Sequence, residues 1–243
     1  MATKPFLIVK VGSTFAEMVP EHGDFDDWFL RAMDLDAREA VVVAVHQGAR
    51  LPDPMDTAGV VVTGSHAMVS DHEPWSEAVA EWIRRLVPRG VPFLGVCYGH
   101  QLLAHALGGT VGYHPGGPEV GTVPVRLTAA AHADPLLGGL PREFHAHSDH
   151  HQSILRLPMG AVVLAANDFE RCHAIRIGAA AWGVQFHPEF DETAMRFYID
   201  AQRDALRSKG QDPDQLLKAI RPTPESASVL RRFVALARRP RHG

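Results

Sequence analysis

The chain has 243 residues, of which 46% are hydrophobic and 21% charged, and these proportions are typical of a folded globular domain. The formal net charge of −4 at pH 7 argues against a nucleic-acid partner, which usually requires a basic face. No segment approaches the roughly 18 to 20 consecutive apolar residues of a membrane span, the N-terminus lacks a secretory pattern, and two cysteines are too few for a disulfide framework. We therefore expect a cytoplasmic chain without membrane association.

Strand-like and helix-like segments alternate along the first part of the chain, as in an α/β fold with a mostly parallel sheet. Residues 6–11 are predicted to form the first strand. A helix is expected to begin at Asp24, because the early carboxylates of Asp24, Asp26 and Asp27 suit the positive end of the helix dipole. Residues 40–45 are almost wholly apolar, which is typical of a strand covered on both faces.

Residues 59–65 are predicted to form the next strand and its exit loop, which contains Gly64 and Ser65. An ordinary strand-end turn and a functional loop are equally compatible with this pair. The following helix is expected to begin at Pro74 and to bury one face. Four apolar residues at helical spacing form that face: Val79, Trp82, Ile83 and Leu86.

The segment from Phe93 to Gly109 is an apolar strand that runs into Gly95-Val-Cys-Tyr-Gly99 and then a short helix. The two glycines remove side chains that would collide where a strand doubles back into a helix, and such a turn pushes Cys97 toward strained dihedrals. The thiol would lie at the first helical turn, where free N–H groups and the helix dipole favour the thiolate. Because a lone cysteine is more often a small core residue, this turn alone leaves both interpretations open.

Three further strands are expected after that helix, at residues 120–127, 161–166 and 174–186. The element 119–121, Glu-Val-Gly, is interpreted as a plain hairpin bend. Cys172 has neither flanking glycines nor a following helix, so we interpret it as a small residue near the start of a strand.

Residues 144–152 are the most polar segment of the chain. The segment contains four histidines: His145, His147, His150 and His151. Imidazole is a common zinc ligand, but no fitting cysteine or helical histidine pair accompanies these residues, and hydrolysis by a thiolate needs no metal. We therefore expect no metal site here.

A second motif follows the apolar residues 182–186, where the chain continues as His187, Pro188 and Glu189. A cysteine nucleophile needs a base that takes and returns its proton, and the base needs a third group to fix its tautomer. His187 can be that base and Glu189 the orienting carboxylate, with the backbone between them stiffened by Pro188. The motif favours the catalytic interpretation of Cys97.

The end of the chain is predicted to be helical. One helix is expected over residues 191–209, a second helical segment over residues 212–220, and a last helix from Thr223, which is a suitable N-cap. The arginines that begin at Arg231 make this end basic. We favour a solvated helix face for them over a docking surface for an acidic partner.

The sequence Gly95-Val-Cys-Tyr-Gly-His-Gln101, together with Gln185-Phe-His-Pro-Glu189, resembles the motifs of the class I glutamine amidotransferases. The similarity is strongest to the amidotransferase domain of GMP synthetase and its free-standing relatives. The resemblance implies a three-layer, flavodoxin-like α/β fold with a mostly parallel central sheet and helices on both faces. We expect one amidotransferase domain over residues 1–208 and a C-terminal helical extension, residues 209–243, packed on it.

The same resemblance assigns roles to individual residues. The implied catalytic residues are Cys97, His187 and Glu189. The backbone N–H groups of Gly64 and Tyr98 would form the oxyanion hole, which a developing negative oxygen requires. The implied substrate-binding residues are Ser65, Gln101, His147, Ser148 and Asp149. The carboxylate of Asp149 would suit the α-ammonium group of glutamine, although His147-Ser-Asp149 departs from the family's commoner Ser-His order.

These residues predict a glutaminase or amidotransferase that forms a γ-glutamyl thioester and needs no cofactor. The sequence has no P-loop and no Ser-Gly-Gly-x-Asp-Ser element of a pyrophosphatase domain. Ammonia would therefore pass to a separate synthetase subunit, or the chain would act alone. A γ-glutamyl hydrolase or peptidase stays open as an alternative, whereas the intact Cys97, His187 and Glu189 argue against a non-catalytic module.

Overall fold

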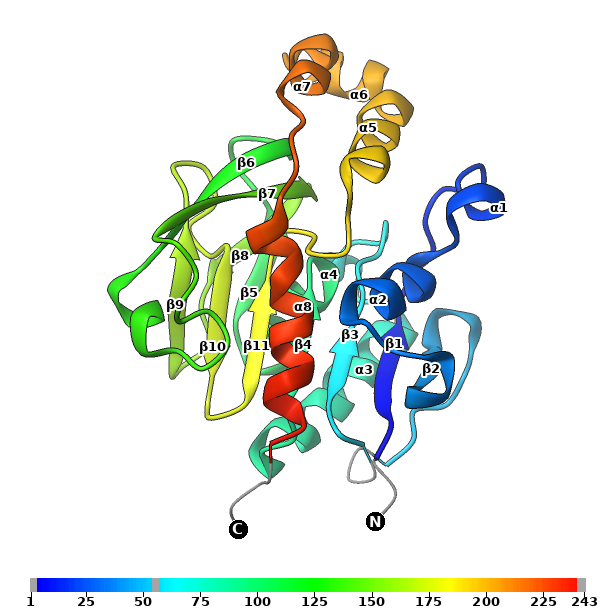
Figure 1. The fold of residues 1–243 in the computed structure, drawn as a ribbon, viewed down its shortest axis with the longest axis vertical. Coiled ribbons are helices and arrows are strands. Elements are labelled where there is room, and N and C mark those ends of the chain that lie inside the picture. The colour runs from blue at the N-terminus through cyan, green and yellow to red at the C-terminus, as the bar shows by residue number, and fades with distance from the viewer. Residues whose placement is uncertain (1–3, 54–56, 240–243) are drawn as a thin grey trace.

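The structure is a computed structural model that describes residues 4–53 and 57–239. Its centre is a nine-stranded sheet in the order β2-β1-β3-β4-β11-β10-β9-β6-β7, and a two-stranded sheet pairs β5 with β8. The strands are β1 Phe6–Lys10, β2 Ala40–Ala44, β3 Val60–Val62, β4 Phe93–Val96, β5 Thr110–Tyr113, β6 Glu119–Leu127, β7 Glu143–His150, β8 Gln152–Arg156, β9 Ala161–Ala166, β10 Ala174–Ile177 and β11 Ala181–Val184. Helices cover both faces of the large sheet (Figure 1), which confirms the predicted three-layer α/β architecture.

The half of the sheet from β2 to β11 is parallel, and it carries the predicted nucleophile. The register pairs Phe6 with Ala40, Leu7 with Val60, and Gly95 with Gly183. Beyond β11, the strands β10, β9, β6 and β7 pair antiparallel. Because the carboxyl ends of parallel strands meet at one edge, the loops after β3, β4 and β11 lie together, as ligand sites of open α/β sheets do.

The helices connect these strands and continue beyond the last one (Figure 1). They are α1 Val19–His22, α2 Phe25–Met33, α3 Pro74–Leu86, α4 Tyr98–Ala106, α5 Glu192–Ala201, α6 Arg203–Ser208, α7 Pro213–Ala219 and α8 Pro224–Ala237. Short 3-10 turns add η1 Ala37–Glu39, η2 Val45–Gln47, η4 Val69–Asp71, η5 Val87–Arg89 and η6 Ala129–Ala133. In the part of the chain that the structure describes, no helix is long and apolar enough to cross a membrane.

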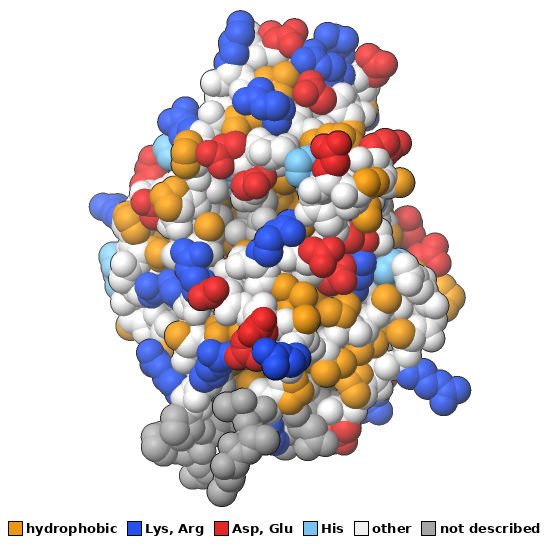
Figure 2. Space-filling view, turned by 45° about the vertical axis from the view of Figure 1, so that its right-hand side comes forward, with side chains coloured by type: hydrophobic (Ala, Val, Ile, Leu, Met, Phe, Trp, Pro, Cys, Tyr) orange, Lys and Arg blue, Asp and Glu red, His pale blue; other side chains and the backbone are white. Residues whose placement is uncertain are grey.

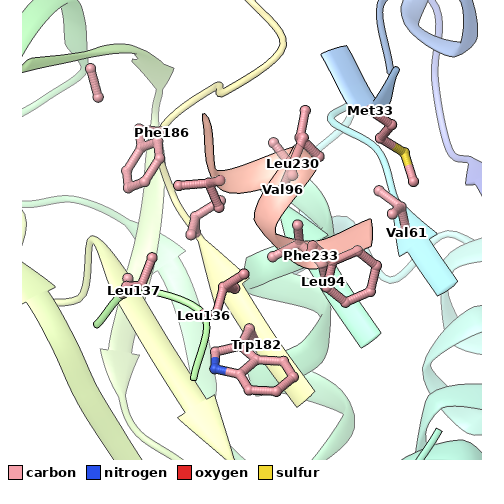
Figure 3. Packing of buried hydrophobic residues seen from close by; sticks show 14 of the residues in the cluster. Met33, Val61, Leu94, Val96, Leu136, Leu137, Trp182, Phe186, Leu230 and Phe233 are labelled. Carbon is pink, nitrogen blue, oxygen red and sulfur yellow. The ribbon is translucent and has the colours of Figure 1, made fainter. Parts of the chain in front are cut away.

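Two hydrophobic cores lie on opposite faces of the sheet. On one face, α2 and α8 pack together over β1, β3 and β4, and Leu230 and Phe233 of α8 lie close to Leu94 and Val96 (Figure 3). On the other face, α3 and α4 bury the apolar sides of the same strands. The last helix therefore belongs to a main core of the molecule, since Phe233 is fully buried.

A third apolar cluster joins α2, β6 and α5, and α5 and β6 lie in the upper part of Figure 1. Asp191 is the N-cap of helix α5, and its side chain accepts a hydrogen bond from the Ala194 N–H. The single helix predicted over residues 191–209 is wrong, because the chain breaks at Gln202 between α5 and α6. The single strand predicted over residues 174–186 is also wrong, because it consists of the antiparallel pair β10 and β11.

Strand β2 lies at the edge of the sheet and differs from its predicted environment. Val41 and Val42 are 47% and 37% exposed, so the expectation of a strand covered on both faces is wrong. A continuous apolar run in the sequence indicates a strand of a parallel sheet, but it does not show whether that strand lies in the centre or at the edge of the sheet. Elsewhere the surface carries mixed charge, and Figure 2 shows acidic and basic side chains interspersed over one face.

Candidate active site

The turn between β4 and α4 places Cys97 in a sterically unusual conformation. Cys97 has φ +49° and ψ −99°, as the predicted strain requires, and a non-glycine residue in this region costs about 1–3 kcal/mol. A Cβ atom on Gly95 would overlap the backbone of Gly99, and one on Gly99 would overlap the carbonyl oxygen of Val62. Glycine is required at both positions because the helix backbone approaches the neighbouring strands this closely.

Hydrogen bonds from neighbouring strands hold this turn. The Cys97 N–H donates to the Val184 carbonyl at 2.8 Å, and the Gly99 N–H donates to the Thr63 carbonyl at 3.2 Å. The turn is thus anchored at the ends of both β11 and β3. Such anchoring fixes the direction of the thiol without a bound ligand.

His187 follows β11 and is held on three sides. Its Nδ1 lies 2.7 Å from Oε1 of Glu189, its backbone N–H donates to the His147 carbonyl at 2.8 Å, and its ring stacks on Phe190 with 4.1 Å between centroids. The bond to an ionised Glu189 places a proton on Nδ1, which leaves Nε2 for another partner. The predicted pairing of His187 with Glu189 is therefore present in the structure.

The charge of His187 depends on its neighbours. Burial of the imidazole disfavours its charged form, but the Glu189 carboxylate and the Cys97 sulfur outweigh burial and raise the pKa of His187 well above the ordinary histidine value. Glu189 is itself buried, with 8% exposed. The charge of the His187 ring therefore depends on both the Glu189 carboxylate and the Cys97 sulfur.

Gly64 lies against both of these groups. A Cβ atom there would come 3.1 Å from Cε1 of His187 and 3.9 Å from Cβ of Cys97, so the absence of a side chain lets the β3 exit loop approach the thiol. Within the described part of the chain, the backbone N–H groups of Gly64 and Tyr98 donate to no other group. Both are thus free to serve as hydrogen-bond donors near the sulfur.

A pocket of about 280 Å³ opens beside Cys97. Its lining residues are Phe15, Ser65, His66, Ala67, Met68, Cys97, Tyr98, Gln101, Asp149, His150, His151, Gln152 and Gln202. This volume is near the lower end of ligand pockets, which begin at roughly 300 Å³. The pocket therefore fits a small molecule of amino-acid size.

Three of the predicted substrate-binding residues, Ser65, Gln101 and Asp149, line this pocket. The amide of Gln101 donates to the Gln152 carbonyl at 2.7 Å and to Oε1 of Gln185 at 3.0 Å. Oδ2 of Asp149 accepts a 2.8 Å hydrogen bond from Gln202. These partners fix the side chains that face the pocket.

The other two predicted substrate-binding residues, His147 and Ser148, are fully buried and do not line the pocket. The ring of His147 lies 3.1 Å from the Thr122 hydroxyl, and the Ser148 hydroxyl donates to Glu119 at 3.0 Å. Both residues lie within strand β7. His147 nevertheless reaches the site through its backbone carbonyl, which accepts the His187 N–H.

Several pocket residues were not predicted from the sequence. Phe15 comes from the loop after β1, His66 from the loop after β3, and Gln202 from the break between α5 and α6. Burial lowers the pKa of His66, whose Nε2 lies 3.2 Å from the Tyr198 hydroxyl. No local pattern marks these residues, because the fold brings them together from distant segments.

The interpretation of residues 119–121 as a plain hairpin bend is wrong. They begin strand β6, in register with residues 148–150 of β7. Glu119 is buried, with 7% exposed, and Oε2 of its carboxylate lies within 3.1 Å of Ser148, His150 and His173. The available signal in the sequence was a single acid at the start of a largely apolar strand, since a carboxylate that a strand buries needs partners.

Comparison with known proteins adds sequence and fold relationships to this geometry. The family model "Glutamine amidotransferase class-I" matches residues 31–201. A GMP synthase (glutamine-hydrolyzing) from Aeropyrum pernix is 33% identical over 77% of this chain, but this chain spans only 33% of that protein's length. A GMP synthase (glutamine-hydrolyzing) subunit from Halobacterium salinarum is 30% identical, with 72% of this chain and 89% of that protein covered.

Two further similarities concern substrate and fold. A gamma-glutamyl-L-1-hydroxyisopropylamide hydrolase from Pseudomonas is 33% identical over 63% of this chain and 53% of that protein. The crystal structure of a glutamine amidotransferase from Thermotoga maritima superposes with a TM-score of 0.76 at 22% identity, covering 97% of this chain and 99% of that one. The match of the family model to most of the chain, together with the cysteine, histidine and glutamate that converge at one sheet edge, shows that this chain belongs to the class I glutamine amidotransferase family.

Proposed function

We propose that this chain hydrolyses the side-chain amide of L-glutamine to glutamate and ammonia through a γ-glutamyl thioester on Cys97. The observation that carries the proposal is the position of the Cys97 thiol. It lies at a strained turn that lines a small pocket, next to an imidazole whose tautomer is fixed by Glu189. A nucleophile, a base and an orienting carboxylate in this order are the parts that covalent acyl transfer requires.

In the first half of the reaction, the Cys97 thiolate attacks the amide carbonyl carbon of glutamine. A carbon–sulfur bond forms, and the carbonyl oxygen takes up the negative charge, which the N–H groups of Gly64 and Tyr98 stabilise. The raised pKa of His187 keeps a proton available on its ring. His187 gives this proton from Nε2 to the leaving nitrogen, the carbon–nitrogen bond breaks, and ammonia departs.

In the second half, a water molecule replaces ammonia next to the thioester. His187 takes a proton from this water as the oxygen attacks the carbonyl carbon, and the carbon–sulfur bond breaks to release glutamate and restore the thiolate. Glu189 keeps its hydrogen bond to Nδ1 of His187 throughout and stabilises the imidazolium. The scheme uses only groups of this chain and requires no cofactor.

Substrate recognition is assigned to the residues that line the pocket. The Asp149 carboxylate, held by Gln202, receives the α-ammonium group, and Ser65 and Gln101 complete the polar wall. His147 and Ser148 are not assigned a direct contact with substrate. The His147 carbonyl holds the backbone of His187, and the Ser148 hydroxyl joins β7 to Glu119 of β6. Their substitution should therefore disturb the geometry of the site more than the recognition of substrate.

Two candidate functions differ in whether the released ammonia passes to a partner protein. Similarity to the GMP synthase subunit from Halobacterium salinarum supports a chain that passes ammonia to a separate synthetase subunit. Similarity to a gamma-glutamyl amide hydrolase supports a second candidate, a γ-glutamyl hydrolase that acts alone on γ-glutamyl amides or peptides. The two candidates share the chemistry at Cys97 and differ in the leaving group.

The test compares release of glutamate from L-glutamine and from a γ-glutamyl dipeptide by the purified chain. Cys97→Ala removes the nucleophile, and Cys172→Ala is the matched control, because burial raises the pKa of the Cys172 thiol to about 11 and keeps it inert. We expect turnover that survives in Cys172→Ala and is lost in Cys97→Ala. Faster turnover of the dipeptide than of glutamine would favour the second candidate.

If the chain turns over substrate only when its partner is bound, covalent labelling still tests the assignment of the nucleophile. An electrophilic glutamine analogue should add once to the wild-type chain and to Cys172→Ala, but not to Cys97→Ala, as read by intact mass. Turnover or labelling that persists in a folded Cys97→Ala protein would refute the assignment of the nucleophile. Absence of both turnover and labelling in the wild-type chain would refute the proposed reaction.

A further inference from the structure

Three side chains outside the pocket converge at the outer side of α3 and α4. His72 follows η4, Glu77 lies in the first turn of α3, and His105 lies in the last turn of α4. Nδ1 of His72 and Nε2 of His105 each lie 2.9 Å from the same oxygen, Oε1 of Glu77. These three atoms lie within 4.8 Å of one another.

The convergence joins segments that are distant in sequence. His105 lies 28 residues from Glu77, and the rings of His72 and His105 are 5.2 Å apart between centroids and tilted by 55°. His72 adopts φ +53°, a left-handed conformation that is uncommon for residues with a side chain. Its backbone N–H donates to the Val69 carbonyl at 3.2 Å, which fixes the position of the ring relative to η4.

The spacing of the three atoms fits a small metal ion. Bonds of about 2.0–2.2 Å in a tetrahedral zinc site place neighbouring ligand atoms roughly 3.3 Å apart. The observed separations of 2.9 Å to Glu77 and at most 4.8 Å between the others bracket that value. Rotations of partly exposed side chains suffice to adjust them, since the side chains of His72 and Glu77 are 60% and 38% exposed.

The donor set selects the class of ion. Two imidazole nitrogens and one carboxylate oxygen are ligands of zinc-class divalent transition ions, and three protein ligands leave a fourth position for water. Calcium and magnesium instead prefer sites made of oxygen ligands. We propose that His72, Glu77 and His105 form a binding site for a divalent transition-metal ion of the zinc class.

The position of this site connects it to the pocket wall. In η4, Ser70 donates its N–H to Oε1 of Gln152 at 3.3 Å and its hydroxyl accepts the Gln152 amide at 2.5 Å. In α3, the Ser76 hydroxyl lies 2.6 Å from the hydroxyl of Tyr98, which lines the pocket next to Cys97. An ion at the site ties η4 and α3 to the far end of the nucleophile helix, and so stiffens one wall of the pocket without touching the reacting atoms.

The test measures binding of Co²⁺ and Zn²⁺ to the tag-free chain that carries Cys97→Ala. This substitution removes the thiol that, with His187, would offer a competing site. Visible absorption reports tetrahedral Co²⁺, and calorimetry reports the affinity and stoichiometry for Zn²⁺. His72→Ala and Glu77→Gln are introduced into the same background, and His132→Ala, which removes an exposed histidine of η6, is the matched control.

We expect one ion per chain in the parent and in His132→Ala. Loss of a ligand should weaken binding by more than the roughly 10–100-fold that loss of an outer-shell partner costs, in both His72→Ala and Glu77→Gln. Zn²⁺ should also raise the melting temperature of the parent but not of these two variants, whose folding is checked in the presence of a chelator. Equal affinity in all four proteins, or no binding by the folded parent, would overturn the proposal.

Discussion

Glu119 is the buried charge on which the antiparallel half of the sheet depends. Its Oε2 accepts from the Ser148 hydroxyl at 3.0 Å and lies 3.1 Å from Nε2 of both His150 and His173, while Oε1 accepts from the Asn167 amide at 2.7 Å. Burial opposes the charge, but hydrogen bonds and the nearby imidazoles hold the pKa of Glu119 well below its usual value. The carboxylate thus joins β6 and β7 to the connection between β9 and β10.

Removal of this carboxylate in Glu119→Ala leaves several polar groups buried without a partner. Each unsatisfied buried group costs about 1–3 kcal/mol, and loss of one member of a buried charged pair costs about 3–5 kcal/mol. The donors of Ser148 and His150 lose their acceptor in the protein interior, whereas the half-buried Asn167 amide keeps its hydrogen bond to the Pro124 carbonyl. We therefore expect the free energy of unfolding to fall by about 4 kcal/mol, a large part of the roughly 5–15 kcal/mol that stabilises a native domain.

Glu119→Gln should cost less, because hydrogen bonding can be rebuilt. The Asn167 amide cannot turn over, since its oxygen accepts the N–H groups of Phe169 and Glu170. The glutamine oxygen therefore faces Asn167, and its NH₂ group faces His150. Nδ1 of His150 lies 2.9 Å from the Gln152 carbonyl, so a neutral ring protonated there offers Nε2 as an acceptor. We expect a loss of about 1–2 kcal/mol.

Urea denaturation followed by tryptophan fluorescence and circular dichroism measures both losses. Glu81→Ala is the control, because it removes only an exposed surface pair with Arg84 and should change the midpoint little. A loss below about 1 kcal/mol in Glu119→Ala would refute the reasoning that the carboxylate satisfies this network. Equal losses in both Glu119 variants would refute the assigned role of the hydrogen bonds and leave only the charge.

Two further predictions concern the nucleophile helix. Gly99→Ala would place a Cβ atom 2.9 Å from Cβ of Val62 and against the Val62 carbonyl oxygen. We expect the free energy of unfolding to fall by about 1–3 kcal/mol in urea denaturation and the alkylation of Cys97 to slow. If neither quantity changes, the steric argument is contradicted. Burial lowers the pKa of His100 to about 3 in the folded chain, whereas an unfolded histidine titrates near ~6.5. Between these two pH values the unfolded chain binds a proton that the folded chain does not. As the pH falls from 7 to 5, His100 should therefore lower the free energy of unfolding by about 2 kcal/mol. His100→Gln should remove that part of the pH dependence in denaturation curves, and a slope equal to that of the wild-type chain would contradict it.

The parts of the site that were predictable are those whose cause is local in sequence. The turn at Cys97 requires glycine on both sides for steric reasons, and Glu189 reaches the ring of His187 from two residues away. Apolar runs also predicted the strands of the parallel half, although not the exposure of the edge strand β2. A conformation that is determined by a few adjacent residues can be predicted without knowing how the rest of the chain packs.

The parts that were not predictable depend on pairing between distant segments. The two-residue period of β7 directs Ser148 and His150 to Glu119, and nothing in residues 144–152 reveals that partner. Gln202 reaches Asp149 only because the helix breaks after α5. Register and helix breaks of this kind are set by tertiary packing, which overrides local propensity.

The local and the distant contributions meet at Cys97. The strain at this residue amounts to about 1–3 kcal/mol, which is the scale of one or two net hydrogen bonds. Strands β3 and β11 supply such bonds through Thr63 and Val184, and the amide of Gln101 adds a third anchor from the helix to the Gln152 carbonyl at the start of β8. The strained turn is therefore maintained by the parallel sheet and by the strand that follows β7, so its geometry is preorganised before any substrate enters the pocket.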